Sequence, residues 1–125
     1  MDFRIKPTVL AQLLNEAGYL EGTYDLVSVA GSGKDLLSDQ TGEKEFLLKQ
    51  IQLSQKLHQI QEVIVLYHDN CGAYGIADTE QEYKTQADDL VKIKSLLSVE
   101  FSSLTFQAYI IKGVPIDSLS LEKII

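Results

Sequence analysis

The stretch from Glu62 to Gly75, EVIVLYHDNCGAYG, limits the possible folds of this 125-residue chain more than any other stretch. Its first half is an unbroken apolar run, Val63 to Tyr67, rich in β-branched and aromatic residues. Such a run predicts a strand buried on both faces of a sheet. Polar residues follow at once, and Gly72 opens a turn. Because ligands in parallel α/β sheets bind beyond the carboxyl ends of the strands, we expect any functional site here.

Two metal-ligating residue types stand at this strand end. The only cysteine of the chain, Cys71, follows one of its two histidines, His68, by three residues. Imidazole nitrogen and thiolate sulfur are preferred donors for zinc, and a catalytic zinc has three protein ligands and one open position. The spacing supplies two donors from one loop, so a third ligand has to come from elsewhere. The alternative is a core histidine beside an inert cysteine, and the spacing alone leaves both open.

The rest of the chain alternates between strand and helix patterns, which predicts an α/β fold of three layers, αβα, with a mostly parallel sheet. The length fits a single domain over residues 1–125. The expected strands are Tyr24–Ala30, Val63–Tyr67 and Leu104–Ile111. Helices are expected from Pro7 to about Gly18, from Thr41 to Gln59, and from Asp78 to Leu97, the last with Ala87, Leu90, Val91 and Leu97 facing inward. The acidic cluster in the last helix, Glu80, Glu82, Asp88 and Asp89, is interpreted as a solvated face.

Charge and composition exclude several partner classes. The net charge of −7 disfavours a nucleic-acid partner and an anionic membrane surface. No apolar run approaches the roughly 20 residues of a membrane span, and no basic, apolar leader opens the chain. We therefore expect a cytoplasmic protein without membrane attachment.

Other catalytic signatures fail on spacing. The glycine pair at Gly31 and Gly33 precedes Lys34, but Ser28 and Asp35 stand where a phosphate-binding loop needs Gly and Ser or Thr. A single cysteine excludes a C-x-x-C redox pair, and no G-x-S-x-G turn is present. His58 is interpreted as a structural or surface residue.

The motifs together resemble the β-class carbonic anhydrases, whose zinc motif reads C-x-D-x-R and, further along, H-x-x-C-G. Asp2 and Arg4 match the D-x-R, and His68, Cys71 and Gly72 match the second part. The resemblance covers roughly residues 1 to 113. It implies that His68 and Cys71 bind zinc, and that Asp2 and Arg4 form a catalytic pair acting on the zinc-bound water. It also implies carbon dioxide and bicarbonate as substrates and a homodimer or larger homo-oligomer as the assembly.

One departure from the family pattern leaves alternatives open. The first zinc cysteine of the family would stand immediately before Met1, and the strand that leads to it is missing with it. Either the chain is a truncated form, or it is a short variant that completes its sheet by other means. Asp2 is then either a third zinc ligand or a terminal acid paired with Arg4. The function is correspondingly that of a carbonic-anhydrase-like zinc enzyme, possibly impaired, or that of a non-catalytic relative acting as a binding module.

Overall fold

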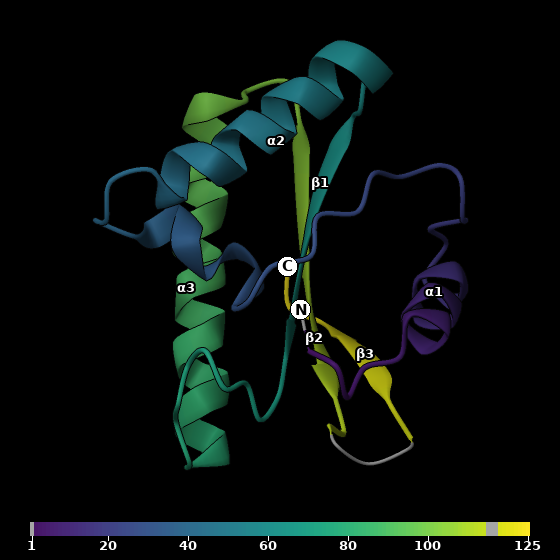
Figure 1. Ribbon diagram of the computed structural model, residues 1–125, viewed down its shortest axis with the longest axis vertical. Coiled ribbons are helices and arrows are strands. Elements are labelled where there is room, and N and C mark those ends of the chain that lie inside the picture. The colour runs from purple at the N-terminus through teal and green to yellow at the C-terminus, as the bar shows by residue number, and fades with distance from the viewer. Residues whose placement is uncertain (1, 115–117) are drawn as a thin grey trace.

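A computed structural model describes residues 2–114 and 118–125 of the chain. Helices and strands alternate as expected for a mixed α/β protein (Figure 1). In chain order the elements are α1 (Pro7–Glu16), the 3₁₀ helix η1 (Ser32–Leu37), α2 (Glu43–His58), β1 (Glu62–His68), α3 (Thr79–Glu100), β2 (Thr105–Lys112) and β3 (Ser120–Lys123).

The three strands form one sheet in the order β1-β2-β3. β1 and β2 are parallel, with Val63 opposite Phe106 and His68 opposite Ile111. β3 runs antiparallel to β2, with Leu121 opposite Ile111. The sheet is thus small and mixed, and the predicted three-layer arrangement around a mostly parallel sheet is not confirmed. β3 was not predicted, because its four residues, SLEK, carry no alternating apolar pattern.

The strand predicted at Tyr24–Ala30 is wrong. Residues 25–29 have no regular secondary structure, and Leu26 and Val27 are 57% and 47% exposed. Strand composition alone thus does not make this segment a strand, since strand propensity depends on packing against neighbouring elements. Asp25 instead accepts hydrogen bonds from Ser54 and from His58 Nδ1, the latter at 2.7 Å. These contacts hold the segment against α2, and they give the exposed His58 the structural role expected of it.

The predicted helices are present with slightly shifted ends. Pro7 is the first residue of α1, where its missing N–H costs no hydrogen bond. α2 begins after Gly42 rather than Thr41, and Glu45 Oε2 accepts from the Gly42 N–H at 3.0 Å. Asp78 is the N-cap of α3, and its side chain accepts from the Gln81 N–H.

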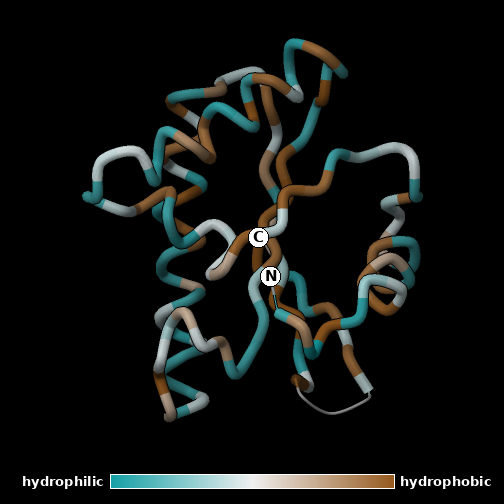
Figure 2. The backbone as a smooth tube through the Cα atoms, viewed as in Figure 1, coloured by the Kyte–Doolittle hydropathy of each residue, from teal (hydrophilic) through white to brown (hydrophobic). Residues whose placement is uncertain are grey.

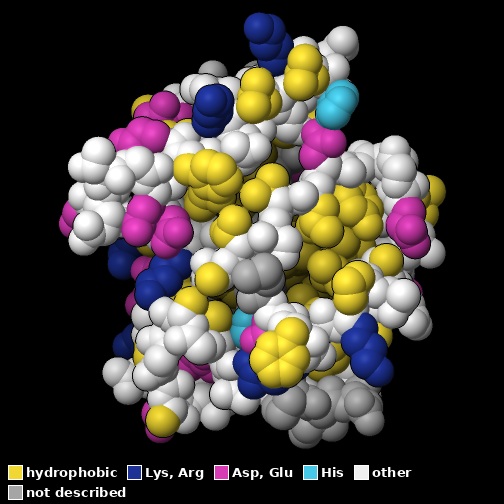
Figure 3. All heavy atoms as spheres, in the orientation of Figure 1, with side chains coloured by type: hydrophobic (Ala, Val, Ile, Leu, Met, Phe, Trp, Pro, Cys, Tyr) yellow, Lys and Arg dark blue, Asp and Glu magenta, His cyan; other side chains and the backbone are white. Residues whose placement is uncertain are grey.

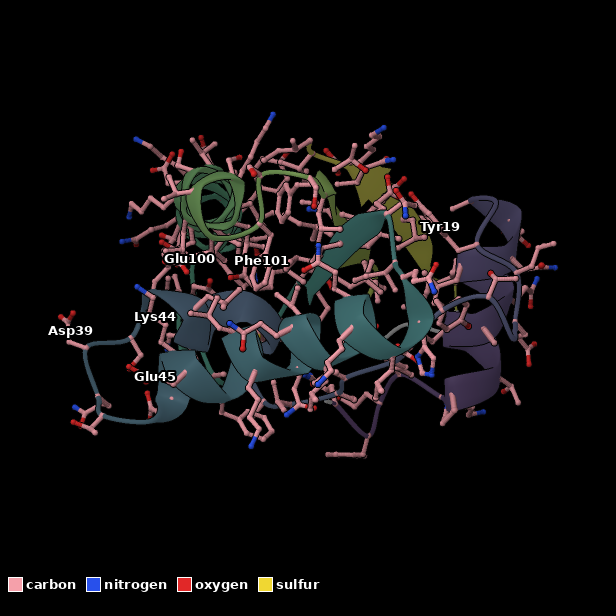
Figure 4. The ribbon with its side chains drawn as sticks, turned by 90° about the horizontal axis from the view of Figure 1, so that it is seen from above. Tyr19, Asp39, Lys44, Glu45, Glu100 and Phe101 are labelled. Atoms are coloured by element: carbon pink, nitrogen blue, oxygen red, sulfur yellow. The ribbon has the colours of Figure 1, made fainter. Side chains whose placement is uncertain are left out.

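The main core lies on one face of the sheet, between β1, β2 and α3. Leu90 and Ile93 of α3 are fully buried there against Val65 and Ile110 of the strands. Leu36 of η1 and Leu47 of α2 close the same core. Figure 2 shows apolar residues concentrated along the central strands, and Figure 4 shows α3 and α1 on opposite sides of them.

A smaller core lies on the opposite face, where Leu13 of α1 packs near Ile111 of β2 and Val114. β1 contributes less to burial than expected. Val65 and Tyr67 are buried on the α3 side, whereas Ile64 and Leu66 on the opposite face are only partly covered. The expectation of a strand buried on both faces is therefore wrong, and β1 also lies at the edge of the sheet among the described residues.

Two details of α3 also differ from the expectation. Val91 points outward and is 57% exposed, although it was placed inside. Glu82, assigned to a solvated acidic face, is 2% exposed. None of the helices in the described part of the chain is both long and apolar enough to cross a membrane.

Candidate functional site

The loop after β1 is fixed to the end of β2. The Asp69 N–H donates to the carbonyl of Ile111 at 3.0 Å. The Asp69 carboxylate in turn accepts the N–H groups of Gly113 and Val114 at 2.8 and 2.9 Å. Because the two parallel strands end side by side, one acidic residue joins both ends. This anchoring sets the position of His68, which immediately precedes Asp69.

The N-terminal turn lies against this loop. Arg4 donates to the Asp2 carboxylate three times, from its backbone N–H and from Nε at 2.9 Å each, and from Nη2 at 2.6 Å. The same Nη2 donates to the carbonyl of Asn70 at 2.8 Å. Residues separated by 66 positions in the sequence are thus joined by one guanidinium group, and Asp2 and Arg4 lie against the loop that follows β1.

His68 is oriented by its two ring nitrogens. Nδ1 lies 2.7 Å from the carbonyl oxygen of Asp69, which only accepts, so Nδ1 carries the proton. In the neutral ring the lone pair is then on Nε2, which lies 3.6 Å from Asp2 Oδ2. A backbone carbonyl on one nitrogen and a free lone pair on the other is the arrangement of a metal-ligating histidine.

Cys71 is a free, buried cysteine three residues further along the loop. Its N–H donates to Glu82 Oε1 at 2.7 Å, so its backbone position is fixed from α3. The pKa of Arg4 is raised, mostly by its hydrogen bond to Asp2 and to a smaller extent by the charges of Cys71 and Asp69. The thiol therefore belongs to the same electrostatic environment as the Asp2–Arg4 pair.

The electrostatics keep Asp2 ionised. The hydrogen bonds from Arg4 lower the pKa of the Asp2 carboxyl to about 2. The Asp2 side chain is only 11% exposed. A partly buried carboxylate held negative in this way attracts a cation or accepts a hydrogen bond from a bound water.

The donor chemistry suits zinc, but the ligand set is incomplete. His68 Nε2 and the Cys71 thiol are zinc donors on one rigid loop. Within residues 2–114 and 118–125, however, no group of three or more His, Cys, Asp and Glu side chains is arranged to hold a metal ion. The residues present therefore offer two side chains of the types that zinc prefers, with the Asp2 carboxylate beside His68.

Sequence reasoning missed Glu82 and Gln86. Both are buried in α3, where they contact the loop between His68 and Cys71. The signal was present, because positions 82, 86, 90, 93 and 97 share the helical spacing of one buried face. Two polar residues on an otherwise apolar face indicate buried hydrogen-bond partners.

The comparisons with known proteins agree with the motifs. The sequence model of a family described as "Putative carbonic anhydrase" matches residues 1–105. An uncharacterised protein of Rickettsia conorii is 28% identical over 99 residues, which cover 78% of this chain and 52% of that protein. The chain thus spans about half the length of this relative. No solved structure matches the chain. The family match includes Asp2, Arg4, His68 and Cys71, and the chain belongs to this family of carbonic-anhydrase-like proteins.

Proposed function

We propose that this chain is a zinc protein of the β-class carbonic anhydrase type that catalyses the reversible hydration of carbon dioxide. The observation that carries the proposal is the position of the Asp2–Arg4 pair, with Asp2 Oδ2 3.6 Å from His68 Nε2. In such an arrangement the histidine lone pair can bind a metal, and the carboxylate, held by the guanidinium group, can orient a water molecule on that metal by accepting its hydrogen bond.

In this proposal His68 and Cys71 hold the metal. When bound, zinc supplies hydroxide near neutral pH, because it lowers the pKa of water to about 7. The Asp69 carbonyl keeps the His68 ring in the tautomer that leaves Nε2 free. Asp2 accepts a hydrogen bond from the water, and Arg4 keeps Asp2 ionised and fixed in orientation.

The third ligand is proposed to come from outside residues 1–125. Both oxygens of Asp2 accept from Arg4, which favours the role of an orienting pair over that of a permanent ligand. The family pattern calls for a cysteine directly before Met1, at the end of a further strand of the sheet. In support, the outer edge of β1 pairs with no other strand in the described ranges, so its backbone groups are available to one.

The assembly is proposed to be a cytoplasmic homodimer or larger oligomer. Phe46, Leu53 and Leu57 form an exposed apolar row on α2, with exposures of 51%, 39% and 64%. Leu26 and Val27 add exposed apolar area elsewhere, and Figure 3 shows apolar side chains gathered in both regions. Apolar surface of this kind typically contacts a partner, and sedimentation at tens of micromolar tests the proposal. A stable monomer would contradict it.

A carbon dioxide hydration assay tests the proposed reaction. We compare zinc-loaded wild type with Asp2→Asn and with Asp25→Asn, an equivalent change at an exposed aspartate that also contacts a histidine. Asp2→Asn should reduce the hydration rate at least tenfold, whereas Asp25→Asn should leave it unchanged. Full activity in a zinc-free preparation would exclude the mechanism.

A second function is favoured by one observation, the lack of a three-ligand cluster among the described residues. In that case the protein is a non-catalytic relative that kept the fold and the Asp2–Arg4 pair as a structural contact. It would bind no zinc and would show no hydration in the same assay.

A further inference from the structure

A buried carboxylate lies directly beneath the candidate site, at Glu82. The residue is 2% exposed and forms no salt bridge within the part of the chain that the structure describes. Burying a charge without a counterion is costly unless several hydrogen bonds compensate. A buried carboxylate of this kind therefore indicates a role that depends on its hydrogen bonds or its charge, which an apolar residue could not fill.

Both oxygens of Glu82 are used on the loop after β1. Oε2 accepts the N–H of Asn70 at 2.8 Å, and Oε1 accepts the N–H of Cys71 at 2.7 Å. Asn70 has a left-handed backbone with φ of 53°, a conformation that asparagine adopts more readily than most other residues with a side chain. The carboxylate therefore holds the left-handed turn between His68 and Cys71.

Gln86, one helical turn further along α3, acts on the other end of the same loop. It is 1% exposed, and its Nε2 donates to the carbonyl of His68 at 2.9 Å. Glu82 and Gln86 together fix the backbone on either side of Asp69. The spacing between the two side chains on α3 thereby sets the spacing between the His68 and Cys71 main chains.

We propose that Glu82 is a positioning residue for the metal site, which holds the loop from His68 to Cys71 in its metal-binding conformation. The inference rests on the proposed zinc function. Glu82 receives two parallel N–H donors, and only a carboxylate offers an acceptor to each of them. The negative charge of Glu82 also lies next to the backbone of Cys71, where it favours a cation bound at the site.

The test compares Glu82→Gln with Glu80→Gln, the same change at an exposed residue in the same first turn of α3. In Glu82→Gln the amide NH₂ faces one of the backbone N–H groups, so one hydrogen bond is lost. Zinc affinity is measured by competition with a chelator. The absorption spectrum of the cobalt-substituted proteins reports the geometry at Cys71, and the melting temperature of the metal-free proteins reports stability.

We expect at least a tenfold rise in the zinc dissociation constant and an altered cobalt spectrum for Glu82→Gln, in the range found for outer-shell changes at other metal sites. Glu80→Gln should match wild type within twofold. A Glu82→Gln protein with a lowered melting temperature but unchanged zinc affinity and cobalt spectrum would overturn the proposal, since Glu82 would then be purely structural.

Glu82→Asp is the second variant, because Glu82→Gln could fail to fold. It keeps the charge but shortens the side chain by about 1.5 Å, so the carboxylate no longer reaches both N–H groups. Weakened zinc binding supports the proposal, and wild-type affinity overturns it. Wild type that binds no zinc would instead refute the proposed zinc function, and this inference with it, so the two failures are distinguishable.

Discussion

Nε2 of His68 lies 3.6 Å from Oδ2 of Asp2, although the two residues are 66 positions apart in the sequence. The contact exists because the N-terminal turn and the loop after β1 meet at the carboxyl end of one strand. Asp2 brings a permanently ionised carboxylate, and His68 brings a lone pair fixed by its tautomer. The functional proposal depends on this pairing.

Arg4 should control the charge of Asp2. Changing Arg4→Met removes the hydrogen bonds that lower the Asp2 pKa, so the pKa should rise from about 2 toward its ordinary value of 3.8. NMR titration of the Asp2 carboxyl measures this directly. Lys6→Met, an exposed residue two positions away, is the matched control and should leave the Asp2 pKa unchanged.

The same pair makes a signed prediction for stability against pH. The folded-state pKa of Asp2 is depressed, so its contribution to the free energy of unfolding is fully present above about pH 4 and is lost as the pH falls toward 2. The stability difference between wild type and Arg4→Met should follow this course in urea denaturation. A difference that is constant from pH 2 to pH 6 would contradict the assigned cause.

Gly33 should resist substitution for reasons of space. A Cβ at this position would lie 3.0 Å from Val65 Cγ1 and 3.3 Å from Ile93 Cδ1, both buried core atoms. Gly33→Ala should lower the free energy of unfolding by about 1 kcal/mol, since overpacking outweighs the entropy gained from losing glycine. Gly72→Ala, where a Cβ meets nothing within 4 Å, is the control. Equal stability of the two variants would show that η1 moves freely away from the core.

Leu90 should dominate the stability of α3. It is fully buried between the helix and the sheet, whereas its neighbour Val91 is 57% exposed. Leu90→Ala should cost about 2–5 kcal/mol, and Val91→Ala less than about 0.5 kcal/mol, in chemical denaturation. A comparable loss for both would mean that Val91 is covered in solution, for example by a second subunit.

Local patterns predicted β1, β2 and the three α-helices because each carries its own apolar period or cap, as Val63–Tyr67 and Asp78 do. They failed where burial depends on a partner. The segment Tyr24–Ala30 has strand composition, but it has no regular secondary structure and exposes Leu26 and Val27. β3 is the opposite case, since its pairing with β2 rather than its own sequence makes it a strand.

In the candidate site, too, some residues could be predicted from the sequence, and others are revealed only by contacts between distant segments. His68 and Cys71 could be found from their spacing, and Asp2 and Arg4 from the family motif. Glu82 could not be found by counting charges, because an acidic residue on a helix is usually solvated. Only the approach of α3 to the loop after β1 shows that its carboxylate accepts two backbone N–H groups.

The zinc content of the two histidine variants tests the central claim most directly. Wild type, His58→Ala, His68→Ala and Cys71→Ser are purified identically, exposed to zinc, dialysed and analysed for metal by mass spectrometry. Wild type and His58→Ala should retain more zinc than the other two proteins, because His58 lies on the surface beside Asp25 and supplies no ligand. His68→Ala and Cys71→Ser should lose it, because each removes a ligand. Equal zinc in all four proteins, whether high or near zero, would contradict a metal centre built on His68 and Cys71.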